Sequence, residues 1–248
     1  MYQPRTYHHW IKDKDLVSFH VVLKETDLHL RAQSNLRREA LRAIQKCRTP
    51  LERYIERHPS FLTALEPVPV AEDAPKMVRE MAEAAQKAGV GPMAAVAGAI
   101  AEEVGRELMK LSAEVIVENG GDIFLNTLKQ RLVGIYASQS PFTGKIALQI
   151  EPQETPLGIC TSSGTVGHSL SLGRADAVIV LSPSAALADA AATAIGNLIK
   201  DAADIPGGID CAQGIDGVKG ILIIKDDKIG IWGKVKIGAL EEEVSPRG

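Results

Sequence analysis

Short segments that alternate apolar and polar residues recur along this chain in pairs, and a turn joins the two members of each pair. In "LVSFHVVLKETDLHLRA" the alternation runs on both sides of the turn "KETD". Later pairs surround "NGGD", "QSPFTG" and "DD". A period of two is typical of half-buried strands, and a short turn makes neighbouring strands antiparallel. We therefore expect a mostly antiparallel sheet.

Helical patterns occupy the space between the strand pairs. One helix is expected from Ser34, as N-cap, to about residue 46, and a second from Pro50, because proline suits the first helical position. Residues 66–75 contain three prolines and are expected to form a loop. A further helix is predicted over Met77–Ala88, ending at Gly89.

Two more helical segments, 91–111 and 182–200, consist largely of small residues. Hairpins combined with flanking small-residue helices indicate an α+β fold rather than a doubly wound parallel sheet. Because each small-residue helix has strands beside it, an internal duplication is one hypothesis. With 248 residues, the chain is long enough for one large domain. Its expected parts are a strand–helix segment (1–75), a core that carries the site (76–200) and C-terminal strands (201–248).

Composition excludes several classes of protein. The net charge of −3 argues against nucleic acid as a partner, since binding to phosphates requires a basic surface. No run reaches the roughly 18 apolar residues of a membrane span, and no secretory signal pattern is found at the N-terminus. The three cysteines are widely spaced, which fits neither disulfides nor zinc, so we expect a cytoplasmic protein. Five histidines lack metal-ligand spacing and are expected to form no coordinating set: His8, His9, His20, His29 and His58.

The alanine-rich segment "SPSAALADAAATAIGNLIK" carries a single carboxylate, Asp189, in its interior. Thr193 follows four residues later and therefore lies on the same helical face. Between Pro183 and Ile199 there is no lysine or arginine to pair with the acid. A hard cation such as Mg²⁺ would suit it. The alternatives are exposure to solvent or hydrogen bonds from a neighbouring loop.

Two polar segments are candidates for binding a ligand. "ENGGDIF" reads either as an ordinary hairpin turn or as a turn whose amide groups cradle phosphate. "CTSSGTVGHS" reads either as a flexible surface loop or as a loop that binds phosphate or ribose oxygens. His168 in the second segment has the chemistry of a proton acceptor near neutral pH, whereas Cys160 is expected to be a buried small residue.

The order of these motifs resembles the ApbE family, the FAD:protein FMN transferases. That family combines a small-residue helix, a strand entering Gly-Gly-Asp, a Thr-Ser-Gly segment, a histidine and an Ala-Asp-Ala-x-x-Thr helix. The corresponding elements here are "AAVAGAIAEEV", "ENGGDIF", "TSSG", His168 and "ADAAAT". The likeness spans about residues 91–197. It departs from the family at Ala97-Gly98, where the family has Lys-Gly, and at the shortened segment "GHSLSLG".

The resemblance implies FAD (or FMN) and Mg²⁺ as cofactors, with Asp189 and Thr193 as metal ligands and His168 at the transfer site. It implies that eight residues bind the flavin nucleotide: Asn119, Gly120, Gly121, Asp122, Thr161, Ser162, Ser163 and Gly164. The implied reaction transfers FMN to a threonine of an acceptor flavoprotein. Two alternatives stay open: a non-catalytic flavin-binding or carrier protein, and a structural protein that self-associates through its small-residue helices.

Overall fold

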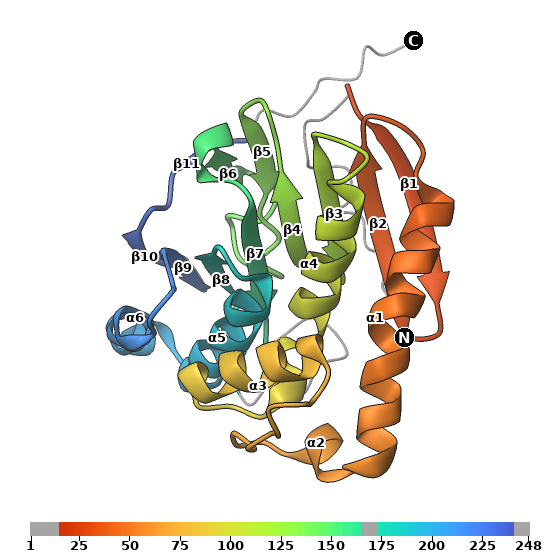
Figure 1. Ribbon diagram of the computed structural model, residues 1–248. Coiled ribbons are helices and arrows are strands. Elements are labelled where there is room, and N and C mark those ends of the chain that lie inside the picture. The colour runs from red at the N-terminus through yellow and green to blue at the C-terminus, as the bar shows by residue number, and fades with distance from the viewer. Residues whose placement is uncertain (1–14, 165–172, 241–248) are drawn as a thin grey trace.

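The computed structural model describes residues 15–164 and 173–240 and has an α+β fold (Figure 1). Its helices are α1 (Arg37–Arg57), α2 (Ser60–Thr63), α3 (Lys76–Ala88), α4 (Val96–Leu108), α5 (Ala185–Leu198) and α6 (Ile205–Gly214). Its strands are β1 (Val17–Leu23), β2 (Thr26–Ala32), β3 (Val115–Asn119), β4 (Asp122–Asn126), β5 (Arg131–Gly134), β6 (Ile146–Ile150), β7 (Leu157–Ser162), β8 (Ala177–Ser182), β9 (Gly220–Lys225), β10 (Lys228–Gly233) and β11 (Ile237–Ala239). The predicted fold class is confirmed.

The strands form two sheets, and every described pairing is antiparallel. The large sheet has the order β1-β2-β3-β4-β7-β8-β9-β10, and the small sheet has the order β11-β6-β5. Within the large sheet a hairpin, then helices, then a second hairpin occur twice, first from β1 to β4 and again from β7 to β10. Strands β5 and β6 of the small sheet lie between these two halves in the sequence, and β11 follows the second half. This repeated order is what the hypothesis of an internal duplication requires.

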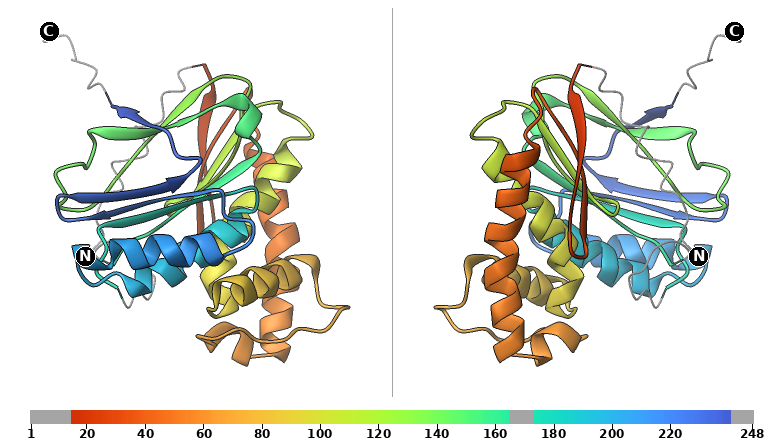
Figure 2. Two further views of the ribbon diagram at one scale, coloured as in Figure 1. Left: turned by 90° about the vertical axis from the view of Figure 1, so that its left-hand side faces the viewer. Right: turned by 90° about the vertical axis from the view of Figure 1, so that its right-hand side faces the viewer.

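The two faces of the large sheet bury different partners. One face packs against the helices, and this core includes Leu28 and Leu30 of β2 together with Ile44 of α1. The other face packs against the small sheet through residues such as Ile123, Leu148 and Ile179. Figure 2 shows the helices gathered on one side of the large sheet. Helices α4 and α5 both lie on this face. The β3–β4 turn therefore contacts α4, and the end of β7 contacts α5.

The prediction that one helix ends near residue 46 and a second starts at Pro50 is wrong. Helix α1 runs unbroken from Arg37 to Arg57, and Pro50 lies inside it. Its buried residues continue on one face across the proline: Ala40, Ala43, Ile44, Leu51 and Tyr54. Burial of this continuous face outweighs the roughly 3 kcal/mol that an interior proline costs.

Two other elements contradict the expectations from sequence. Thr161 and Ser162, expected in a loop, form the end of strand β7, which pairs with both β4 and β8. Helix α6 occupies part of the region expected to hold only strands. Its segment "IPGGIDCAQG" has a low intrinsic helix propensity, but Ile205 and Gly208 are buried against its neighbours. Pairing and packing override local preference in both elements.

Other boundaries agree with the sequence. Helix α3 ends at Gly89, whose φ of +71° places it in the left-handed region that glycine favours at a helix end. Helix α5 lies within the segment expected at 182–200, and the Ser184 hydroxyl, which was not predicted as a cap, accepts the Leu187 N–H at 3.3 Å. Residues 66–75 form the expected loop. Among residues 15–164 and 173–240, no helix has the length and apolar character needed to cross a bilayer.

Candidate functional site

The β3–β4 turn, the end of strand β7, the start of helix α4 and the middle of helix α5 meet at one end of the large sheet. Asn119 and Asp122 face each other across the turn. The Asp122 carboxylate accepts the Thr161 N–H at 3.3 Å, which joins the turn to β7. The Asn119 amide donates to the Ala97 carbonyl at 3.0 Å, which joins the turn to helix α4. Residues expected to bind nucleotide are thus brought together from distant parts of the chain.

Asp189 lies against helix α4 and does not project into open solvent. Its carboxylate accepts the Gly98 N–H at 2.9 Å, and the Ala97 N–H also bonds to it. These donors belong to the first turn of α4, where backbone N–H groups have no partner within the helix. The acid therefore accepts backbone hydrogen bonds, as one alternative from sequence expected, but the donors belong to helix α4 and not to a loop.

The charge of Asp122 raises the proton affinity of Asp189, and we call these two buried carboxylates the acid pair. Burial raises the pKa of Asp122 to about 7, with a further contribution from the charge of Glu118. Burial also raises the pKa of Asp189 well above its ordinary value, and the Asp122 charge adds to that effect. Buried carboxyl groups of this kind stay protonated unless a cation or another positive group stabilises their charged form.

The acid pair fits a divalent cation such as Mg²⁺. Magnesium takes oxygen ligands, binds proteins through one or two carboxylates and retains waters or phosphates in the rest of its shell. A cation would offset the cost of burying these two carboxylates in their charged form, and burial is the main cause of both raised pKa values. Thr193, the second predicted ligand, is partly buried one helical turn from Asp189. Its hydroxyl is the third oxygen that this face of α5 offers.

Cys160 lies beside the acid pair. The thiol is fully buried, donates to the Ala185 carbonyl at 3.3 Å and is also hydrogen-bonded to Asp122. Burial and the neighbouring carboxylates raise its pKa well above the ordinary value for cysteine. It therefore stays a neutral thiol rather than a nucleophile, which agrees with the expectation of a buried small residue.

Gly120 and Gly121 form a hairpin turn between β3 and β4, which is one of the two structures predicted for "ENGGDIF". Gly120 and Gly121 have φ values of +70° and +113°, and residues other than glycine rarely adopt these backbone angles. A Cβ atom on Gly121 would meet nothing within 4 Å, so open space borders the turn. Its role as a phosphate cradle stays a prediction.

The serine-rich segment starts beside helix α5. A Cβ atom on Gly196 would lie 2.9 Å from the Ser162 Oγ, which shows how closely β7 and α5 approach. Ser163 and Gly164 continue directly from β7. His168 and Thr165 lie outside the described residues, so the predicted catalytic histidine has no structural assignment.

A cavity lies nearby, between α3, α4 and the start of α5. Its described lining includes Glu80, Glu83 and Glu102 with Lys87, so acids dominate it. Glu102 also accepts the Ala185 N–H at 2.7 Å, which uses a free donor at the start of α5. The described residues that line this cavity include none of the predicted nucleotide-binding residues. Its acidic lining does not suit a diphosphate.

Gly98 lets helix α4 approach helix α5 closely enough for its N–H to bond to Asp189. A Cβ atom at this position would clash with the Ala185 carbonyl oxygen and would lie 2.9 Å from the Asp189 Cβ. We expect Gly98→Ala to push helix α4 from helix α5 and to lower the free energy of unfolding by about 1–3 kcal/mol, despite the better helix propensity of alanine.

The matched control is Gly207→Ala in helix α6, where an added Cβ would meet nothing within 4 Å. This variant should be neutral or more stable by up to about 1 kcal/mol, because alanine is the better helix former. Urea unfolding measures both variants. Equal stability of the two would contradict the close approach of α4 and α5.

The chain matches one family model and is similar in sequence to UPF0280 proteins of archaea. The family model described as "AbpE bacteria" matches residues 8–207. A UPF0280 protein of Methanocaldococcus jannaschii is 43% identical over 221 residues, covering 87% of this chain and 90% of that protein. A UPF0280 protein of Methanosarcina acetivorans is 42% identical over 221 residues, covering 87% and 86%.

Solved structures show the same fold. The apo crystal structure of Pseudomonas stutzeri flavinyl transferase ApbE matches with a TM-score of 0.58 at 13% identity, covering 88% of this chain and 94% of that one. A mutant of flavin transferase ApbE from Vibrio cholerae matches with a TM-score of 0.52 at 13% identity, covering 88% and 97%. The likeness to the ApbE family inferred from sequence motifs is confirmed at the level of fold.

Proposed function

This chain belongs to the family described as "AbpE bacteria", and on that premise we propose that it binds a flavin nucleotide with Mg²⁺ and transfers FMN from FAD to a protein threonine. The observation that carries the proposal is the acid pair, two carboxylates with raised pKa values beside the β3–β4 turn. The fold shared with flavin transferases supports the choice of ligand. The proposed acceptor is a flavoprotein.

Each part of the site has a proposed task. Asp189, with Asp122 and Thr193, would hold Mg²⁺, which supplies positive charge to the diphosphate of FAD. The turn at Gly120 and Gly121 would bind phosphate oxygens through backbone N–H groups. Four residues at the end of β7 would contact the nucleotide through hydroxyl and backbone groups: Thr161, Ser162, Ser163 and Gly164.

The proposed reaction balances as a single displacement at phosphorus. The threonine oxygen forms a bond to the FMN phosphorus, the P–O bond within the diphosphate breaks, and AMP leaves. The threonine proton passes to His168 or to a carboxylate oxygen of Asp189. Because Asp189 is already bonded to backbone N–H groups and assigned to the metal, His168 is the preferred acceptor.

Flavin binding without transfer is the second candidate function. The observation that favours it is the Ala97-Gly98 pair at the start of α4, where the ApbE pattern has Lys-Gly. A cationic contact to the nucleotide is therefore missing at this position. Moreover, the Ala97 carbonyl is bonded to the Asn119 amide. A site built in this way would hold the flavin with less polarisation of its phosphates.

Titration of the full chain with FAD, with and without Mg²⁺, tests nucleotide binding. Incubation with FAD, Mg²⁺ and a threonine-bearing acceptor flavoprotein then tests transfer by the release of AMP. Mg²⁺-dependent binding with AMP release supports the transferase. Binding without AMP release supports the carrier, and no flavin affinity under either condition contradicts both.

A further inference from the structure

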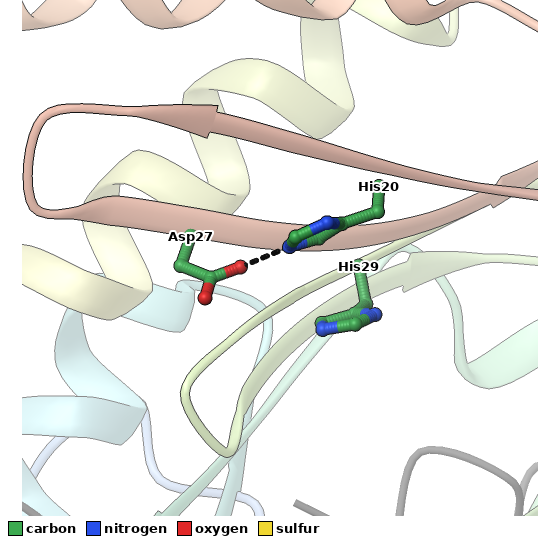
Figure 3. Close-up of side chains that lie close together, drawn as sticks. All are labelled: His20, Asp27 and His29. Atoms are coloured by element: carbon green, nitrogen blue, oxygen red, sulfur yellow. Dashed lines mark hydrogen bonds and ion pairs between the residues drawn. The ribbon is translucent and has the colours of Figure 1, made fainter. Parts of the chain in front are cut away.

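Two histidines and an aspartate meet on the β1–β2 hairpin. His20 of β1 lies directly opposite His29 of β2 in the strand register. Asp27 precedes His29 by two residues, so its side chain points to the same face of the sheet. Figure 3 shows the three side chains gathered on one side of the hairpin.

The donor atoms of this cluster are already near coordination distance. One ligand atom from each residue lies within 4.8 Å of the others. The imidazole rings of His20 and His29 stack with centroids 4.4 Å apart, and His20 Nε2 contacts an Asp27 carboxylate oxygen. Tetrahedral Zn²⁺ with bonds of about 2.0–2.1 Å holds its ligand atoms roughly 3.3 Å apart. Small side-chain rotations would therefore close the site.

The hairpin presents the cluster on a rigid support. Leu28 and Leu30 alternate with Asp27 and His29 along β2, and both leucines are fully buried against the helices. The cluster accordingly lies on the opposite face of the sheet. Seven residue pairs join β1 to β2, and β2 also pairs with β3. Strand positions hold side chains in place better than loop positions do.

The cluster is open to water. The His20 and Asp27 side chains are 45% and 35% exposed, so an ion from solution has access and water can complete its shell. Glu118 of β3 lies opposite His29, and Arg31 is two residues along β2 on the same face. Both are buried. Asp27 is the carboxylate within the cluster, and Glu118 is a second carboxylate beside it.

We propose that His20, Asp27 and His29 bind a divalent transition-metal ion, with Zn²⁺ as the reference ion. Two imidazoles and one carboxylate are a donor set for borderline metals, and three protein ligands leave positions for water. Mg²⁺ is not the expected ion here, because it prefers oxygen ligands and keeps its waters. A metal would replace the contact between His20 and Asp27 with bonds from both residues.

Calorimetric titration of the full, untagged chain with Zn²⁺ tests this site, with Mg²⁺ as a parallel titrant. We expect saturable Zn²⁺ binding that weakens at least 10-fold in each of His20→Gln, Asp27→Asn and His29→Gln. The control is His58→Gln, because His58 is an exposed histidine that stacks on Tyr54 outside the cluster. It should bind as the parent does. Co²⁺ in place of Zn²⁺ should give tetrahedral visible absorption that the same three variants lose.

The result is independent of the flavin proposal. Asp189→Asn should leave Zn²⁺ binding at the hairpin unchanged, whatever it does to Mg²⁺ or FAD. Zn²⁺ affinity that persists in both histidine variants, or that is absent from the parent chain, would overturn the hairpin site. Because His20 and Asp27 are substantially exposed, their substitutions should leave the thermal melting temperature unaffected, and circular dichroism checks this.

Discussion

Asp189→Asn should weaken Mg²⁺-dependent FAD binding by on the order of 100-fold, about 2.7 kcal/mol. The substitution keeps the shape of the side chain, and the asparagine oxygen can still accept the Gly98 N–H. Packing of helix α4 on helix α5 should therefore survive. What is lost is the negative charge that, on our proposal, holds the cation. FAD titrations with and without Mg²⁺ measure the change.

The matched control is Asp210→Asn, which removes one negative charge from an exposed position on helix α6. It should leave FAD and Mg²⁺ affinity within about twofold of the parent, because exposed charges are screened by salt. Unchanged FAD affinity in Asp189→Asn, with Mg²⁺ present, would leave that acid a helix cap alone. The metal role of α5 would then be wrong.

Asp122→Asn should stabilise the metal-free protein above pH 7 and have little effect near pH 4. The pKa of Asp122 is raised from an ordinary 3.8 to about 7 in the folded state. Between these values the folded state binds a proton that the unfolded state does not, so stability falls as pH rises through this window. Asparagine removes the cost of ionising a buried acid. The gain at pH 8 should be about 2 kcal/mol, or roughly 4–8 °C in Tm.

Thermal melts from pH 4 to pH 8 measure this effect, and repeating them with Mg²⁺ adds a second test. A cation bound to the acid pair should raise the Tm of the parent at pH 8, since a ligand that binds only the folded state stabilises it. The same addition should do much less for Asp122→Asn. A constant difference in Tm between variant and parent at every pH would show that Asp122 titrates normally.

Local features of this chain were predictable from sequence because they depend on neighbouring residues. Gly89 ends helix α3 through a left-handed conformation, and Ser184 caps helix α5 through its hydroxyl. The Gly120-Gly121 turn needs positive φ values, which glycine adopts without strain. Each of these effects acts within a few residues, so the local sequence is enough to indicate the cap or the turn.

Local preference failed where burial outweighed it. Pro50 predicts a helix start, but the continuous apolar face of α1 carries the helix through it. The glycines of "IPGGIDCAQG" disfavour a helix, but Gly208 lets α6 pack closely on its neighbours, since a Cβ there would lie 2.8 Å from an Ile223 methyl group. The burial energies of α1 and α6 arise from contacts with residues that are distant in the sequence, so the local sequence does not reveal them.

The sequence by itself determined that one acid interrupts an alanine helix and that no basic residue near it in the chain pairs with it. Only the tertiary structure decided which groups face that acid: Gly98, 91 residues away, and Asp122 from the hairpin. The same holds for His20 and His29, which lie opposite each other only because of the strand register. Turns and caps follow from short-range sterics and hydrogen bonds, whereas the partners of a side chain follow from strand pairing and helix packing, which bring distant residues together.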